Sequence, residues 1–285
     1  MKIAFATDEN WPDLYIDDHE AVNALARRGH VVDAVIWDDH STDWTTYDAV
    51  VLRSTWDYYL KPDAFRNWID DLDGRCVTLV NDPRTLRWNL DKIYLRDLQD
   101  AGVPITPTVF ATSGTSLNDV LRENGWSDVV MKPRVSAAGH RTVRLSAGEA
   151  DLHQAELDDL ISHGGALIQP YLDVIESDGE WSMIFLGGRF SHAALKKPAH
   201  GEFRVQFQFG GSAETGDPPA ALVSQAERVV KAVLTPWTYA RVDGCVVNGQ
   251  FLLMELEMLE PLLFLLQDAH AADRFADAIE AAVRP

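Results

Sequence analysis

A tight-turn signal around residue 248 constrains the fold of this chain more than any other feature. Asn248-Gly249 separates two largely apolar stretches, and this dipeptide is typical of a two-residue turn between antiparallel strands. Glu255 and Glu257 stand two residues apart in the second stretch, so their side chains point to one face of the expected strand. The sequence therefore predicts a hairpin that presents two neighbouring carboxylates.

Asp243, on the first strand of this hairpin, reaches the same face only if the strand pairing is irregular. A strict two-residue turn would place Asp243 opposite Met254, whose side chain points to the other face. We therefore predict a β-bulge, supplied by Gly244 or Gly249, that brings the three carboxylates to one face.

Three carboxylates that follow Arg241 in the sequence and share one face would suit hard divalent cations, which bridge phosphate oxygens. The alternative is a solvated acidic edge strand. It fits less well, because Leu253 and Leu256 predict a strand that is buried on at least one side, and buried carboxylates need cations or metal. We interpret Asp243, Glu255 and Glu257 as metal ligands.

The composition excludes several classes of protein. The formal net charge of −19 argues against binding to nucleic acid or to anionic membrane. Only Cys76 and Cys245 are present, without a CxxC pair, so neither a disulfide framework nor a structural zinc site is indicated. The apolar runs are too short to span a bilayer, and Met1 leads into a strand pattern, so we expect a cytoplasmic protein.

The first hundred residues alternate between strand-like and helix-like patterns. Strands are predicted at 3–7, 31–37, 49–53 and 77–81, and helices at 18–28 and 62–72. Such alternation favours an α/β lobe with a doubly wound parallel sheet.

The rest of the chain follows an α+β pattern. Helices are predicted at 90–99 and 275–283. Further strands are predicted at 108–111, 129–134, 166–170, 181–186, 190–195 and 251–257. We therefore predict an amino-terminal lobe at 1–100, a central part at 101–172 and a carboxyl-terminal part at 173–285.

Two further motifs suggest nucleotide chemistry. Lys132 ends an apolar strand before a small-residue loop, an arrangement that can place an ammonium and backbone N–H groups on phosphates, although such lysines are more often solvated. The strand ending at Gln169-Pro170 can act as an adenine hinge, and Glu180 can accept from ribose hydroxyls, although a loop acid more often faces solvent. GxxxxGK[ST], GxGxxG and GxSxG motifs are absent, which disfavours P-loop, Rossmann and nucleophile-elbow chemistry.

Together these pieces resemble the ATP-grasp superfamily, in the branch of bacterial glutathione synthetase and the RimK-type glutamate ligases. The resemblance covers most of the chain and implies an ATP-grasp fold, in which two α+β subdomains clasp ATP beside the amino-terminal lobe. It rests on these stretches in this order: 89–92, 131–133, 168–172, 195–197 with 203–204, and 241–243 with 255–257.

The resemblance implies a role for each matching residue. Lys92 and Lys132 would contact ATP phosphates under a lid at 136–139 that includes Ser136 and Gly139. Gln169, Tyr171 and Leu172 would line the adenine hinge, and Glu180 would hold the ribose. Lys196 and Arg204 would neutralise the transferring phosphoryl group, and Arg241 would steady the acyl phosphate. Asp243, Glu255 and Glu257 would hold one or two Mg²⁺ ions, for which Mn²⁺ can substitute.

The sequence departs from the family pattern at two places. Many relatives carry Glu-x-Asn on the metal strand, whereas this chain carries Glu255-Leu-Glu257, which changes the charge and keeps an oxygen ligand. The stretch 259–264 differs from the Ser/Pro/Gly-rich segment of glutathione synthetases, so their substrate contacts do not transfer. Three stretches, 52–58, 132–137 and 254–264, resemble the cyclo-ligases of D-cycloserine biosynthesis, which close O-ureido-D-serine.

A polar cluster follows the third predicted strand. The carboxyl ends of strands in an open α/β sheet face the ligand crevice, so Arg53, Ser54, Thr55 and Asp57 are predicted substrate contacts. The equally plausible alternative is a packed aromatic-rich loop around Trp56.

These observations predict an ADP-forming carboxylate–amine ligase that acts through an acyl phosphate on a small amino-acid-like substrate. An intermolecular amino-acid or peptide ligase remains an alternative, and so does a catalytically silent nucleotide-binding regulator. The resemblance also implies a homo-oligomer, a dimer or a tetramer.

Overall fold

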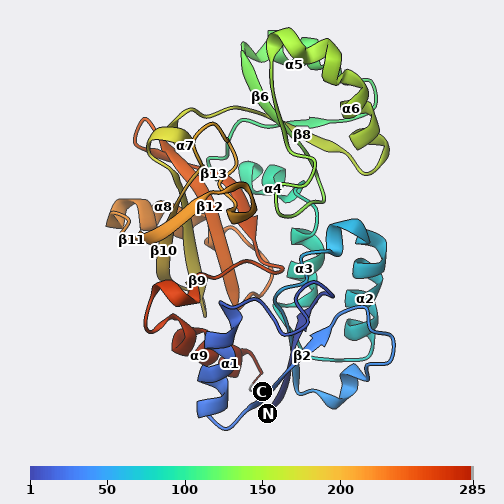
Figure 1. Cartoon of the computed structure of the whole chain (residues 1–285), viewed down its shortest axis with the longest axis vertical. Coiled ribbons are helices and arrows are strands. Elements are labelled where there is room, and N and C mark those ends of the chain that lie inside the picture. Colours follow the sequence, from blue (N-terminus) through green and yellow to red (C-terminus); the bar gives the residue numbers. More distant parts are fainter. Residues whose placement is uncertain (284–285) are drawn as a thin grey trace.

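Within residues 1–283, which the computed structural model describes, the chain forms three β-sheets (Figure 1). The first is parallel, in the order β2-β1-β3-β4. Its strands are β1 (Lys2–Thr7), β2 (Val31–Ile36), β3 (Ala49–Leu52) and β4 (Leu79–Val80). The helices α1 (Asp18–Arg27) and α2 (Pro62–Gly74) connect its strands. Apart from Lys2, the residues of the central strands β1 and β3 are all buried, because both faces of the sheet are covered.

The second sheet is antiparallel, in the order β5-β8-β6-β7, and lies at the top of Figure 1. Its strands are β5 (Val109–Ala111), β6 (Asp128–Pro133), β7 (Val143–Ser146) and β8 (Ala166–Pro170). The helices α5 (Leu117–Asn124) and α6 (Ala150–Ser162) pack against it around Leu117, Leu157 and Ile168.

The third sheet is antiparallel, in the order β11-β10-β9-β12-β13. Its strands are β9 (Glu180–Leu186), β10 (Arg189–Lys197), β11 (Ser212–Gly216), β12 (Tyr239–Val247) and β13 (Gln250–Glu257). The helix α7 (Val174–Ser177) precedes β9, and α8 (Ala220–Lys231) covers the apolar face of β12 and β13. Short 3₁₀ helices lie at Trp44–Thr46, Tyr58–Leu60, Ala147–Glu149, Phe207–Phe209 and Leu265–Gln267.

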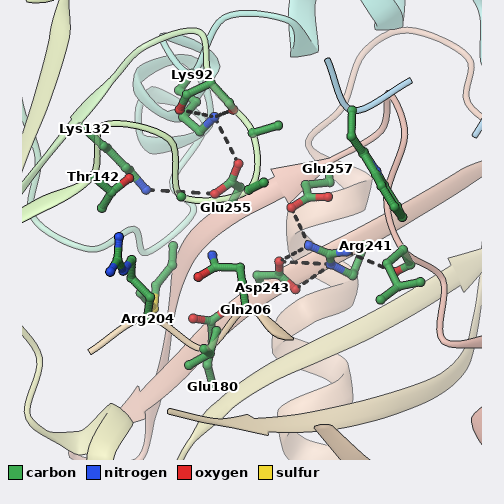
Figure 2. Close-up of a pocket in the computed structure, with 18 of the residues that line it drawn as sticks. Lys92, Lys132, Thr142, Glu180, Arg204, Gln206, Arg241, Asp243, Glu255 and Glu257 are labelled. Atoms are coloured by element: carbon green, nitrogen blue, oxygen red, sulfur yellow. Dashed lines mark hydrogen bonds and ion pairs between the residues drawn. The ribbon is translucent and has the colours of Figure 1, made fainter. Parts of the chain in front are cut away.

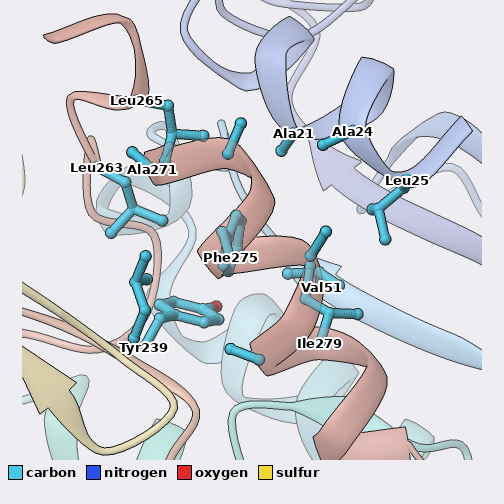
Figure 3. Close-up of a cluster of buried hydrophobic side chains, with 14 of the residues drawn as sticks. Ala21, Ala24, Leu25, Val51, Tyr239, Leu263, Leu265, Ala271, Phe275 and Ile279 are labelled. Carbon is cyan, nitrogen blue, oxygen red and sulfur yellow. The ribbon is translucent and has the colours of Figure 1, made fainter. Parts of the chain in front are cut away.

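The last helix, α9 (Ala271–Val283), returns to the amino-terminal lobe (Figure 3). Phe275 and Ile279 on its buried face belong to one apolar cluster with Leu25 of α1, Val51 of β3 and Tyr239 of β12. This cluster joins the first and third sheets, because it contains side chains from both.

The connection between the first two sheets corrects one prediction. A single helix was predicted at 90–99, whereas the structure has α3 (Pro83–Asn89) and α4 (Tyr94–Asp100). The break lies at Asp91, whose carboxylate accepts from the Ile93 N–H at 2.9 Å and pairs with Arg134. A side chain that binds its local backbone competes with helix continuation. The elements α3, α5, α6, α7, α8, β7 and β11 were not predicted.

The predicted fold class is confirmed, with a parallel α/β lobe followed by two α+β parts. Each sheet falls within one of the three predicted segments, and the division at 100 and 172 stays a prediction. No helix among the described residues is long and apolar enough to cross a membrane.

Candidate active site

A pocket of about 800 Å³ is lined by residues from all three parts of the chain. It gathers most of the residues that the sequence singled out. These are Asp57, Lys92, Lys132, Ser136, Gly139, Gln169, Tyr171, Leu172, Glu180, Lys196, Arg204, Arg241, Asp243, Glu255 and Glu257. They come from positions more than 190 residues apart in sequence, so only the tertiary fold assembles the site.

The predicted β-bulge is confirmed in the hairpin of β12 and β13. Asp243 pairs with Glu255, whereas the next residue, Gly244, pairs with Leu253, so Met254 is the extra residue of β13. A Cβ atom at Gly244 would lie 2.3 Å from the Leu252 carbonyl oxygen, too close for any other residue. The bulge therefore needs a glycine at this position, and it brings Asp243 to the face of the two glutamates.

The turn itself follows the prediction. Val247 pairs with Gln250, which leaves Asn248 and Gly249 as a two-residue loop. Both turn residues have positive φ values, 52° and 80°, as a type I′ turn requires.

Cross-strand pairing builds a polar row over β10, β9, β12 and β13. Lys196 pairs with Glu180, and their side chains meet at 2.5 Å. Asp243 lies opposite both Ser182 and Glu255, accepts from the Ser182 hydroxyl at 2.5 Å, and lies 3.4 Å from the Lys196 ammonium. Burial opposes ionisation of Asp243, but Arg241 and Lys196 outweigh it and lower its pKa to about 2.

Arg241 of β12 links Asp243 of the same strand to Glu257 of β13 (Figure 2). Its guanidinium donates to both carboxylate oxygens of Asp243, at 2.8–3.0 Å, and also to Glu257. Its third partner is the carbonyl of Leu262, to which it donates at 3.0 Å. Burial raises the pKa of Glu257 to about 7, although the positive charge of Arg241 opposes this shift.

Two lysines neutralise Glu255. The Lys92 ammonium lies 3.2 Å from one carboxylate oxygen and the Lys132 ammonium 4.0 Å from the other (Figure 2). Burial opposes ionisation of Glu255, but the two ammonium groups prevail and lower its pKa. The Lys92 ammonium also donates to the Ser136 carbonyl at 2.5 Å, which ties it to the loop after β6.

The three carboxylates share one face, but they do not form a preformed metal cage. Among residues 1–283, no group of three acidic, histidine or cysteine side chains is close enough to hold an ion alone. Asp243 and Glu255 instead face each other as a pair of hard oxygen donors whose charge is balanced by arginine and lysine. This donor set fits Mg²⁺, which proteins commonly bind through one or two carboxylates together with substrate phosphates.

The predicted hinge residues also line the pocket. Gln169 donates to the Thr108 hydroxyl at 2.9 Å, which fixes its side chain. The Tyr171 ring lies under the Arg144 guanidinium at 3.5 Å, and its hydroxyl donates to Glu176. Leu172 packs in the neighbouring apolar cluster. The three side chains are thus held in place by protein contacts.

The loop that contains Ser136 and Gly139 touches the other two parts of the chain. The Tyr58 hydroxyl donates to the Ser136 carbonyl at 3.3 Å, and Gln208 donates to the Ala138 carbonyl at 2.7 Å. Arg204 lines the pocket nearby, where its guanidinium pairs with Glu202 at 2.9 Å.

The structure corrects three of the four predicted substrate contacts. Arg53, Ser54 and Thr55 are at most 1% exposed and do not line the pocket. Arg53 donates to Asp18 at 2.7 Å and to the Pro261 carbonyl at 3.0 Å, and Ser54 donates to the same aspartate at 2.9 Å. The alternative of a packed loop holds for these residues, and only Asp57 borders the pocket.

Several pocket residues were not predicted. Asp8 follows β1, and the strand-end argument applied to β3 would have found it. Trp11, Tyr15 and Trp56 form an aromatic cluster with ring centroids 5.0–5.9 Å apart. Glu260 also lines the pocket, in the very stretch where the sequence departs from the family pattern.

Comparisons with known proteins agree with this geometry. Residues 91–237 match the model of the prokaryotic glutathione synthetase ATP-grasp domain, and residues 3–81 match that of the D-cycloserine synthetase DcsG N-terminal domain. The cycloserine biosynthesis protein DcsG of Streptomyces lavendulae is 27% identical over 99% of both chains. A glutathione synthetase of Parasynechococcus marenigrum (strain WH8102) is 30% identical over 56% of this chain and 49% of its own.

Solved structures give the same result. The crystal structure of D-cycloserine synthetase DcsG aligns over 100% of both chains, with a TM-score of 0.91 and 25% identity. The Bacillus anthracis D-alanine–D-alanine ligase complexed with ATP covers 99% of this chain and 97% of its own, with a TM-score of 0.70 and 17% identity, and so shares the fold. The chain therefore belongs to the ATP-grasp family of the prokaryotic glutathione synthetase type, and it is an ATP-dependent ligase.

Proposed function

We propose that this ligase closes O-ureido-D-serine to D-cycloserine through an acyl phosphate. The observation that carries the proposal is the end-to-end similarity to D-cycloserine synthetase, which includes the amino-terminal lobe at 3–81. In this chain, that lobe supplies one wall of the pocket, including Asp8 and Trp56. The pocket volume of about 800 Å³ lies in the range of small-molecule sites.

The proposed reaction has two bond-forming steps. A substrate carboxylate oxygen attacks the γ-phosphorus of ATP, and ADP leaves. The substituted ureido nitrogen, which is bonded to oxygen, then attacks the acyl carbon, so that phosphate leaves and the five-membered ring closes. The carbamoyl group is removed by hydrolysis afterwards.

The residues of this chain have distinct parts in the proposal. Lys92 and Lys132 bind the phosphates, and Gln169, Tyr171 and Leu172 enclose the adenine end under the loop at 136–139. Lys196 and Arg204 neutralise the transferring phosphoryl group, and Arg241 holds the acyl phosphate. These cations surround the reacting groups before the reaction starts, and such preorganisation is the main source of rate in phosphoryl transfer.

Mg²⁺ is part of the proposal. Asp243 and Glu255 would hold it, and Glu257 would take part once Arg241 releases it. When bound, the ion neutralises charge on the phosphates and orients them. Because Arg241 already pairs with Glu257, the proposal assigns the first ion to Asp243 and Glu255, and a second ion would bind only after Glu257 is released.

The test is ADP release with Mg-ATP and O-ureido-D-serine, with the L-isomer as control. Turnover of the D-compound with a cyclic product is the expected result. ADP release only after addition of a second amine would move the assignment to intermolecular ligation. The expected homo-oligomer is tested separately by light scattering.

A further inference from the structure

The carboxylate of Glu260 has no ion-paired cation among the described residues of the pocket. Glu260 is 6% exposed and lines the pocket, yet no hydrogen bond or ion pair joins its carboxylate to another residue in the described part of the chain. The charges of Lys92 and Arg241 act on the carboxylate without an ion pair, and among residues 1–283 its only hydrogen bond is to its own backbone N–H. Burial and the neighbouring Glu257 raise the pKa of Glu260 to about 8, as expected for a carboxylate without a partner.

The other acids of the pocket are already satisfied. Asp243 has Arg241 and Lys196, Glu255 has Lys92 and Lys132, and Glu257 has Arg241. Glu180 is paired with Lys196 and Asp57 with Lys61. Asp8 also lacks a cation, but its carboxylate accepts from the N–H groups of Asn10 and Trp11, at 2.7 and 3.2 Å.

The segment that carries Glu260 is held rigidly. Five consecutive carbonyl groups, those of residues 259–263, each accept a hydrogen bond from a side chain of another element. The donors are, in order, Tyr239, Trp56, Arg53, Arg241 and His192, at 2.8–3.0 Å. A buried carboxyl group without a paired cation rests in its protonated form, and a ligand that brings a positive charge beside it allows it to ionise.

The surroundings of Glu260 indicate which ligand would bring this positive charge. The segment follows the metal strand directly, so it lies beside the reacting centre. The Trp56 indole, which donates to the Glu260 carbonyl, belongs to the aromatic cluster with Trp11 and Tyr15. Aromatic rings favour an organic cation.

We propose that Glu260 binds the protonated amino group of the substrate and so selects amino acids over simple carboxylic acids. This inference rests on the proposed function and deepens it. The ammonium group of an amino-acid substrate supplies the missing positive charge, and it is fixed close to the carboxylate that is to be activated. Glu260 is thus a specificity residue for the α-amino group.

The test compares two substrates in three proteins. The substrates are O-ureido-D-serine and its desamino analogue, 3-(ureidooxy)propanoate. The proteins are the wild type, Glu260→Gln, and the matched control Asp8→Asn, which changes the other pocket acid without a cation. kcat/KM is measured from ADP release at saturating Mg-ATP, together with the KM for ATP and the melting temperature.

We expect the wild type to prefer the amino compound by about 10- to 100-fold, the range of a charge-assisted hydrogen bond. In Glu260→Gln, kcat/KM should fall for the amino compound and stay the same for the desamino analogue, so that the preference is lost. The KM for ATP should not change. Asp8→Asn should retain the preference. An equal loss for both substrates in Glu260→Gln, or loss of the preference in Asp8→Asn instead, would overturn the inference.

Failure of the proposed function is distinguishable from failure of this inference. If the wild type turns over neither compound, the cyclo-ligase function is wrong. The same comparison is then made with the substrate that the ADP assay accepts and its desamino counterpart. An accepted substrate without an amino group, or an unchanged preference in Glu260→Gln, would overturn the role of Glu260.

Discussion

Asp243 lies directly opposite Glu255 because β13 carries one residue more than β12 at this point of the hairpin. Without the bulge, Asp243 would face Met254, and the two carboxylates would point to opposite faces of the sheet. The site therefore depends on the register of one hairpin, and the register depends on Gly244.

Substitution of Gly244 by alanine should damage both fold and activity. The added Cβ would meet the Leu252 carbonyl at 2.3 Å and the Phe251 ring at 2.5 Å, and backbone atoms cannot yield as side chains do. We expect a loss of about 1–3 kcal/mol in the free energy of unfolding, measured by urea denaturation. Gly74→Ala is the control, because nothing lies within 4 Å of its Cβ position. Equal stability of the two variants would contradict the packing argument.

Loss of the metal-strand carboxylates should abolish turnover without unfolding the protein. Asp243→Asn and Glu255→Gln each remove an oxygen charge that the proposed Mg²⁺ site needs, so we expect ADP release to fall by about 100-fold or more. EDTA should abolish the activity, and Mg²⁺ or Mn²⁺ should restore it. The control is Glu227→Gln, at a surface pair with Lys231. Activity that survives EDTA would refute the metal assignment.

Arg53 should act on stability more than on substrate contact. It is 1% exposed and pairs with the buried Asp18, so Arg53→Leu leaves an uncompensated carboxylate and should cost about 3–5 kcal/mol of unfolding free energy. Arg66→Leu breaks the exposed pair with Asp63 and should cost less than about 1 kcal/mol. An Arg53 variant as stable as the wild type, with a raised KM for the carboxylate substrate, would restore the original prediction of direct contact.

His192 should make stability depend on pH. Burial lowers the pKa of His192 from its ordinary value of 6.5, although its hydrogen bond to the Leu263 carbonyl opposes this shift. The unfolded chain then binds a proton more readily, so stability is present above pH 6.5 and falls as the pH drops from there towards the folded pKa. The slope contributed by this one group is at most about 1.4 kcal/mol per pH unit.

The measurement is the unfolding free energy at pH 7.5 and at pH 5.5. His192→Gln should lose less stability between the two values than the wild type, because the titrating ring is gone. The exposed His163→Gln should follow the wild type. A pH difference that is unchanged in His192→Gln would show that other groups account for it.

Much of the site was predictable from local sequence. The turn at Asn248-Gly249 and the spacing of Glu255 and Glu257 are properties of neighbouring residues, because side chains alternate along a strand. With regular pairing, the Asp243 side chain would point to the opposite face from the two glutamates, so a bulge was required. Gly244, which forms it, was one of the two glycines that the sequence offered. Such inferences succeed because they concern backbone geometry over a few residues.

Other features were decided only by the tertiary structure. Arg53 follows a strand end, and its charge would suit a substrate carboxylate. In the fold it is buried and pairs instead with Asp18 of α1, which is 35 residues away in sequence. Glu260 stands out because no lysine or arginine in residues 1–283 pairs with it, whereas lysines and arginines from distant elements pair with the acidic residues around it. Local sequence determines which face a side chain takes, whereas charge pairing is a property of groups brought together by the fold.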